Sequence, residues 1–219
     1  MRPRPVKMFR SPAEQRMTPF RPIRGLIFDL DGTLVDSGLD FPWMKREMGL
    51  PPGQPILESV ESLDEPRRGE CWRFLEAQEE AGARRATLMP GVTQFLAELE
   101  ARYIRRAVLT RNSRSVTLAT LARFDLRFDP IVTREDGPVK PDPSAIWEIC
   151  KAWELATDEV ALIGDFVHDI EAGRRAGVRT VLYDGQRELS SRDGTILADQ
   201  VLLSFEQSAQ LLRWLEQPA

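Results

Sequence analysis

Histidine is nearly absent from this sequence, and cysteine is scarce. His168 is the only histidine among 219 residues, which argues against a histidine base and against a metal site built from histidines. Cys71 and Cys150, the two cysteines, lie far apart and form no metal-ligand pattern. Because no secretory segment is recognisable, we expect both to be reduced thiols, as in a cytoplasmic protein.

Long apolar runs are missing as well. No run of apolar residues approaches the ~20 that a membrane-spanning helix needs, so we expect no membrane partner. The N-terminal stretch also lacks the apolar segment of a signal peptide. Together these two absences favour a cytoplasmic location.

Basic charge is concentrated at one end of the chain. Residues 1–24 hold seven basic residues and one acidic residue, Glu14. The whole chain has 30 basic and 34 acidic residues, so 23 basic and 33 acidic residues remain after residue 24. The net charge of this remainder is about −10, which argues against a nucleic-acid-binding core. Residues 1–22 are rich in Arg and Pro with little apolar content, which predicts a flexible N-terminal arm.

Apolar and amphipathic segments alternate along most of the remaining chain. The expected strands are 25–30, 104–110, 130–133, 160–164, 179–183 and an edge strand at 200–203. The expected helices between and after them begin near Val92, Ser113, Asp142, Ile170 and Phe205. Such alternation predicts an α/β core in which helices cover both faces of a central parallel sheet.

Residues 39–88 interrupt this alternation. Helical patterns at 42–48, 54–62 and 66–86 predict a small α-helical cap, inserted into a core formed by residues 23–38 and 89–219. Asp64 is the predicted N-cap of the third of these helices, with Pro66 in its first turn. Asp142 is predicted to cap a core helix in the same way, with Pro143 at the first helical position.

The stretch Gly25–Ser37, with the sequence GLIFDLDGTLVDS, carries the clearest chemical signal. Asp29 and Asp31 follow a buried apolar strand, where an unpaired carboxylate is costly, so a divalent cation is the expected partner. The two carboxylates are two positions apart, with Leu30 between them, and are predicted to leave the strand on the same face. Gly32 then allows a sharp turn.

Polar residues also follow the other expected strands. Thr110, Arg111 and Asn112 follow one strand, and Thr110 together with nearby backbone amides is suited to an anion. Seen alone, Thr110 and Asn112 would be ordinary helix-capping residues. The carboxyl ends of parallel strands meet at one edge of the sheet, where ligands bind in such folds, so we expect these residues to lie near Asp29.

Two further motifs complete this set. Lys140 precedes Pro141 and supplies a fixed positive charge, although alone it would be assigned to the surface. Asp165 and Asp169 follow the strand 160–164 as a second carboxylate pair. Oxygen ligands without histidine or cysteine point to Mg²⁺ rather than Zn²⁺.

These motifs, in this order, resemble those of the haloacid dehalogenase-like (HAD) phosphatase superfamily. The resemblance covers about residues 25–183 with a gap at the insertion, and it implies a Rossmann-like three-layer core with a helical cap. The stretch LDFPWMKREMGLPPGQPILE, residues 39–58, is similar to the cap opening of a phosphoglycolate-phosphatase-like subset with a reduced cap.

The resemblance also implies roles for the residues that match. Asp29 would be the nucleophile that forms an aspartyl-phosphate, and Asp31 the general acid and base. Asp29, the backbone carbonyl of Asp31, Asp165 and Asp169 would hold Mg²⁺. Thr110, Asn112 and Lys140 would bind the phosphoryl group of a small phosphomonoester, and Lys140 would also restrain Asp29.

Several alternatives remain open from the sequence. A phosphomutase shares these motifs, although a small cap disfavours it, because a mutase must exclude water. A binding or regulatory protein with the same fold, and a nucleic-acid-directed phosphatase guided by the basic arm, are two others. Arg111 could contact the far end of a substrate or pair with Glu135 or Asp136. The chain could act as a monomer or a homodimer.

Overall fold

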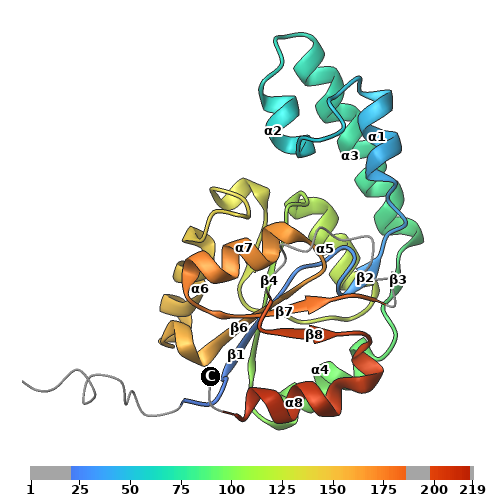
Figure 1. Cartoon of the computed structure of the whole chain (residues 1–219). Coiled ribbons are helices and arrows are strands. Elements are labelled where there is room, and N and C mark those ends of the chain that lie inside the picture. Colours follow the sequence, from blue (N-terminus) through green and yellow to red (C-terminus); the bar gives the residue numbers. More distant parts are fainter. Residues whose placement is uncertain (1–20, 186–197, 218–219) are drawn as a thin grey trace, which may run out of the picture.

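The computed structural model describes residues 21–185 and 198–217. Its centre is a six-stranded sheet in which every neighbouring pair of strands is parallel (Figure 1). In spatial order the strands are β5 (Ile131–Val132), β4 (Arg105–Leu109), β1 (Gly25–Phe28), β6 (Val160–Gly164), β7 (Arg179–Tyr183) and β8 (Gln200–Leu202). The predicted α/β class and parallel sheet are confirmed, including the edge strand at 200–202.

Helices cover both faces of this sheet, because the side chains of each strand alternate between them. On β1, Leu26 and Phe28 pack into one core cluster, whereas Ile27 packs into the other. The first cluster also holds α4 (Val92–Ala101), α5 (Arg114–Arg123) and α8 (Ser208–Leu215). The second holds α6 (Ser144–Trp153) and α7 (Val167–Ala176). The core therefore has the three layers expected of a Rossmann-like fold.

The insertion consists of α1 (Phe41–Glu47), α2 (Ile56–Glu61) and α3 (Arg67–Arg85). It has a small apolar cluster of its own, formed by Met44, Met48, Leu50, Ile56, Val60, Cys71 and Leu75. Figure 1 shows the three helices standing apart from the sheet, with α3 running back down to the core. Cys71 lies in this cluster and Cys150 in the core, both buried and free. No helix among residues 21–185 and 198–217 is long and apolar enough to cross a bilayer.

Some local predictions need correction. Asp64 is not the N-cap of α3: Pro66 takes that position, and it is the side chain of Glu65 that accepts a hydrogen bond from the amide of Gly69, at 3.3 Å. Asp142 does accept a hydrogen bond from the amide of Ser144, at 2.9 Å, but α6 begins at Ser144, so Pro143 precedes the helix. α7 begins three residues earlier than predicted, at Val167. A 3₁₀ turn, η5 (Phe205–Gln207), precedes α8.

A two-stranded sheet was not predicted at all. β2 (Val35–Asp36) pairs antiparallel with β3 (Thr87–Leu88), and these strands are the two connections between the core and the insertion. Each has only two residues, too few to show a strand pattern in sequence. The pairing fixes where the insertion leaves and rejoins the core.

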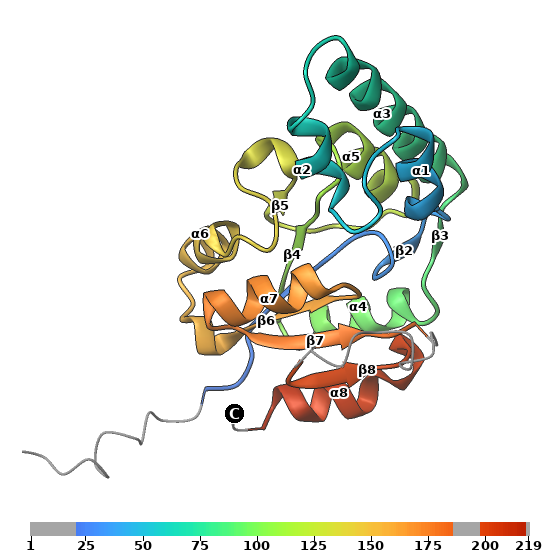
Figure 2. The same ribbon diagram turned by 45° about the horizontal axis from the view of Figure 1, so that its top comes forward.

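The C-terminal half of α3 is held against the core by buried contacts. Arg134 of η2 (Arg134–Asp136) pairs with Glu79 of α3 at 2.5 Å, and their side chains are only 8% and 4% exposed. Arg123 of α5 donates to the carbonyl oxygens of Ala83, at 2.9 Å, and Ala86, at 2.7 Å. Figure 2 shows α3 beside α5, the helix that it packs against.

Replacing Glu79 with alanine should destabilise the protein strongly. The change leaves the guanidinium of Arg134 buried without its carboxylate partner, at an expected cost of about 3 kcal/mol in the free energy of unfolding. Glu80→Ala is the matched control, because Glu80 lies on the same helix but pairs with Arg84 at the surface, where a pair contributes at most about 1 kcal/mol. Urea unfolding of the two variants would test this, and equal losses would contradict the assignment.

The predicted N-terminal arm, residues 1–22, lies almost entirely outside the described residues. At its end, Arg21 pairs with Glu159 at 3.3 Å. Ile23, the next core residue, is buried and donates its amide to the carbonyl of Leu215 at 3.1 Å.

Deleting residues 1–17 should leave kcat and the melting temperature largely unchanged. The deletion ends before Arg21 and Ile23, whose contacts with the core it therefore keeps. Thermal melting and steady-state kinetics of the shortened chain would check this. A large drop in either quantity would show that the arm is part of the folded core.

Candidate active site

Asp29 lies immediately after β1, in the middle of the sheet. Its amide donates to the carbonyl of Ile163 on β6 at 2.9 Å, so the backbone pairing extends one residue beyond the strand. Two residues of this region must be glycine. A Cβ on Gly32, which has a φ of +81°, would run into the carboxylate of Asp165, and one on Gly164 would run into Asp169.

Lys140 lies between two carboxylates. Its ammonium is 2.6 Å from Oδ1 of Asp29 and 2.6 Å from Oδ1 of Asp169, and its side chain is only 3% exposed. Burial alone would lower the pKa of Lys140, but Asp169 and Asp29 raise it above its ordinary value. The lysine is therefore a fixed cation beside Asp29.

Three carboxylates gather at the ends of β1 and β6. One oxygen from each of Asp29, Asp165 and Asp169 lies within 4.8 Å of the others. Burial, and secondarily the neighbouring carboxylates, outweigh the attraction of Lys140 and raise the pKa of Asp29 to about 8. Three carboxylates facing one ammonium leave an excess of negative charge, which fits a divalent cation with oxygen ligands.

Asp31 lies two residues beyond Asp29 in the turn after β1, where its backbone forms an isolated bridge with Val35. Its carboxylate oxygen Oδ2 accepts a hydrogen bond from the side-chain amide of Asn112, while burial raises its pKa. The side chain of Asp31 is not a member of the three-carboxylate group. A carboxyl that holds its proton more strongly than usual can donate it to a leaving group.

Thr110 and Asn112 follow β4, the neighbour of β1. Thr110 is buried, and its hydroxyl accepts a hydrogen bond from the amide of Asn112 at 3.2 Å. The predicted substrate-binding Asn112 therefore reaches the Asp31 carboxylate directly. The ends of β1, β4 and β6 place Asp29, Asp31, Thr110, Asn112 and Asp165 at one edge of the sheet, as expected. The loop 139–142 and the first turn of α7 bring Lys140 and Asp169 to Asp29.

Arg111 does not pair with Glu135 or Asp136. Its Nη2 lies 2.5 Å from Oε2 of Glu58 on α2, and its Nη1 donates to the backbone carbonyl of Lys140. Asp136 pairs instead with Arg114. The suggested pairing with these two residues is wrong because both belong to the core, whereas the carboxylate partner comes from the insertion.

In the sequence, His168 lies between Asp165, which precedes α7, and Asp169, which is on that helix. Its ring is 5.2 Å from that of Phe166 in an edge-to-face arrangement. Burial lowers its pKa, and its Nδ1 has no hydrogen-bond partner within the described parts of the chain. The ring thus packs beside the site.

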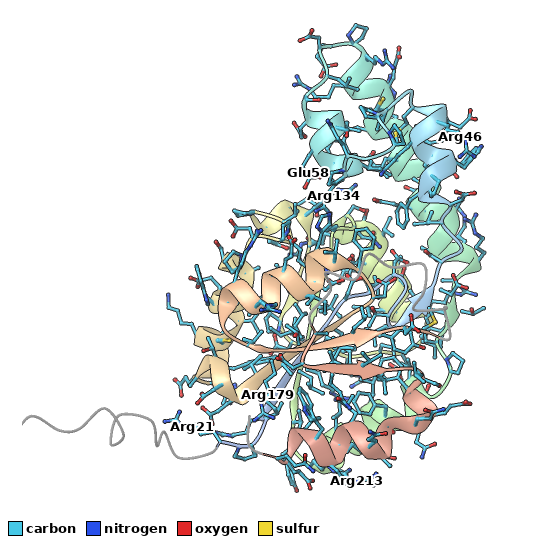
Figure 3. All side chains as sticks on the ribbon, viewed as in Figure 1. Arg21, Arg46, Glu58, Arg134, Arg179 and Arg213 are labelled. Carbon is cyan, nitrogen blue, oxygen red and sulfur yellow. The ribbon has the colours of Figure 1, made fainter. Side chains whose placement is uncertain are left out.

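Glu58, Glu79 and Arg134 could not be identified as contact residues from the sequence. Each pair between insertion and core joins residues more than fifty positions apart. Charged residues on exposed helix faces are common, so nothing in the pattern marks these glutamates. Figure 3 shows Glu58 reaching from α2 toward the core loop that carries Arg134.

Comparisons with known proteins agree with this arrangement. Residues 44–183 match the family of haloacid dehalogenase-like hydrolases. A haloacid dehalogenase-like hydrolase domain-containing protein of Arabidopsis thaliana is 32% identical, covering 74% of this chain and 71% of the relative. A phosphoglycolate phosphatase of Chromobacterium violaceum is 29% identical, covering 73% and 84%.

The fold is also known from solved structures. A hydrolase from Pseudomonas syringae superposes with a TM-score of 0.72 at 20% identity, covering 89% of this chain and all of the other. The expected resemblance is thereby confirmed. The chain belongs to the haloacid dehalogenase-like hydrolase family.

Proposed function

We propose that this protein is a Mg²⁺-dependent phosphatase that hydrolyses a small phosphomonoester through an aspartyl-phosphate on Asp29. One observation carries the proposal: Lys140 pairs with Asp29 beside Asp165 and Asp169, and Asp31, two residues farther on, accepts a hydrogen bond from Asn112. Phosphoryl transfer needs an in-line nucleophile, charge neutralisation and a proton for the leaving oxygen, and this set offers all three.

In the first half of the reaction, a carboxylate oxygen of Asp29 attacks phosphorus. The bond from phosphorus to the leaving oxygen breaks, and Asp31 gives that oxygen its proton. In the second half, Asp31 takes a proton from water, which attacks the aspartyl-phosphate and releases phosphate. Thr110 and Lys140 bind the phosphoryl oxygens throughout.

Asp29, the backbone carbonyl of Asp31, and Asp165 would hold the metal, with Asp169 in support. When bound, Mg²⁺ would neutralise negative charge on the phosphoryl group and on the surrounding carboxylates. The excess of carboxylates over ammonium groups in this region supports that assignment.

Phosphate release from an aryl phosphate and from a panel of metabolite phosphomonoesters, with and without Mg²⁺, tests the proposal. The Chromobacterium violaceum relative is named a phosphoglycolate phosphatase, so phosphoglycolate belongs in the panel. We expect Mg²⁺-dependent release from at least one compound. No release from any of them by the folded protein would favour a regulatory role, and transfer of phosphate between two positions of a sugar would favour a mutase.

The basic arm is the sole feature in support of a nucleic-acid substrate. A gel-shift assay with DNA and RNA at two salt concentrations would test this, because binding through basic residues weakens steeply with salt. We expect no shift.

A further inference from the structure

Arg111 joins the insertion to the backbone of the active site. It follows Thr110 at the end of β4, and one guanidinium contacts two different segments. Nη2 pairs with Glu58 on α2 at 2.5 Å, and Nη1 donates to the carbonyl oxygen of Lys140. Although partial burial works in the opposite direction, the hydrogen bond from Arg111 holds the pKa of Glu58 below its ordinary value, so Glu58 is ionised at neutral pH.

The position of the Lys140 ammonium depends on the loop that carries it. The loop 139–142 is tied by the amide of Asp142, which donates to the carbonyl of Val139 at 3.0 Å. Arg175 donates to the carbonyl of Pro141 at 3.1 Å, and Arg111 donates to that of Lys140. Of these three ties, the one from Arg111 also reaches the insertion.

Among residues 21–185 and 198–217, two ion pairs join the insertion to the core, and they differ in burial. Glu79 and Arg134 are nearly fully buried, whereas the side chains of Glu58 and Arg111 are 47% and 20% exposed. Exposed pairs are weak and exchange readily, while breaking a buried pair is costly. The contact that Glu58 of α2 makes with the core is therefore expected to break more easily than the contact that Glu79 of α3 makes.

We propose that Arg111 is a positioning residue that couples the docking of α2 to the placement of Lys140. When Glu58 is seated, the guanidinium is held in place and fixes the Lys140 carbonyl, and with it the ammonium between Asp29 and Asp169. This inference rests on the proposed phosphatase function. It assigns Arg111 to the support of the phosphoryl site, not to the far end of the substrate.

The primary test uses a small aryl phosphate, which carries no charged group beyond its phosphate. Arg111→Ala and Glu58→Ala should each lower kcat by about tenfold, a modest loss because Lys140 itself is retained. The double variant should be no slower than Arg111→Ala, because both changes break the same connection. Undiminished turnover of the aryl phosphate by Arg111→Ala would overturn the proposal.

A charge exchange separates positioning from simple attachment. Glu58→Arg combined with Arg111→Glu restores an ion pair between α2 and the core, but a glutamate cannot donate to the Lys140 carbonyl. We expect kcat to remain as low as in Arg111→Ala. Recovery of kcat would mean that the pair only attaches the insertion, and the proposal would fail.

Two other variants serve as controls. Glu61→Ala removes an exposed glutamate from the same helix and should keep kcat within about twofold of wild type. Arg175→Ala removes the other guanidinium tie to the loop, so adding Glu58→Ala to it should lower kcat by the same factor as in wild type. The effects of Glu58→Ala and Arg175→Ala on kcat should thus be additive. If they were instead as non-additive as the effects of Glu58→Ala and Arg111→Ala, Arg111 would have no specific role.

Hydrogen exchange provides a measurement that needs no turnover. The amides of Lys140 and Asp142 should exchange faster in both Glu58→Ala and Arg111→Ala than in wild type, and those of Glu61→Ala should not. Unchanged exchange at these amides in Glu58→Ala would refute the coupling. If the wild type hydrolysed no phosphomonoester, the function would be wrong, and this measurement would still decide whether α2 and the loop are coupled.

Discussion

Replacing Asp29 with asparagine will reduce phosphate release by a factor of about 10⁴ or more, below detection in an ordinary assay. The side-chain amide has nearly the same shape but cannot attack phosphorus as a carboxylate does. Asp31→Asn should retain a nucleophile but lack a proton donor, so we expect a loss of about 10²- to 10⁴-fold. Asp31→Asn should regain part of its activity with a substrate whose leaving group departs without a proton.

The control for this comparison is Asp36→Asn. Asp36 lies on β2, close in sequence to both catalytic candidates, but it is exposed, and its Oδ1 accepts a hydrogen bond from the amide of Gly38 at 2.9 Å. Its turnover should stay within about twofold of wild type. If Asp29→Asn retained near-normal turnover while folding normally, the nucleophile would have to be sought elsewhere.

Removing divalent metal will abolish turnover, and adding Mg²⁺ will restore it. The physical reason is the surplus of carboxylates around Lys140, which without a cation repel both one another and an incoming phosphate. The change in melting temperature on adding Mg²⁺ tests metal binding independently of catalysis. Mg²⁺ that binds the folded protein relieves this repulsion and must raise the melting temperature.

This thermal shift should grow with pH. The pKa of Asp29 rises from 3.8 to about 8 on folding, so in the metal-free protein its contribution to stability is fully present below pH 3.8 and is lost as the pH rises toward 8. Mg²⁺ needs the ionised carboxylate and competes with the proton. We expect a larger shift at pH 8.5 than at pH 5.5.

Scanning calorimetry with and without Mg²⁺, at constant ionic strength, would measure this difference. The variant Asp165→Asn, Asp169→Asn should show little shift at either pH, because two of the three carboxylates are gone. A shift as large as that of the wild type would place the metal somewhere else on the protein.

Most of the core could be predicted from the sequence because its signals are local. The strands at 160–164 and 179–183 match β6 and β7 residue for residue, since each is a short, mainly apolar segment in which every residue is buried. The predicted site residues meet because parallel strands place their carboxyl ends along one edge. No assumption about the insertion was needed for either result.

The contacts of the insertion could not be predicted, because they depend on how two separately packed units meet. Arg111 was assigned either to substrate or to carboxylates nearby in the core, yet its partner is Glu58, 53 positions away. Periodicity identifies the buried face of a helix such as α2, but it does not identify which exposed carboxylate faces the core. The β2 and β3 pairing escaped prediction for a related reason, since it joins segments from the two ends of the insertion.

The pairing of Asp36 with Thr87 has an evolutionary consequence. Residues 37–86 leave and rejoin the core at adjacent points, much as a guest domain does when its termini lie together. During evolution this segment can therefore be lengthened, shortened or exchanged while β2, β3 and the strand ends of the core keep their positions. Descendants of one ancestral protein could acquire new substrates by replacing this one segment, while the residues at the strand ends of the core remain unchanged.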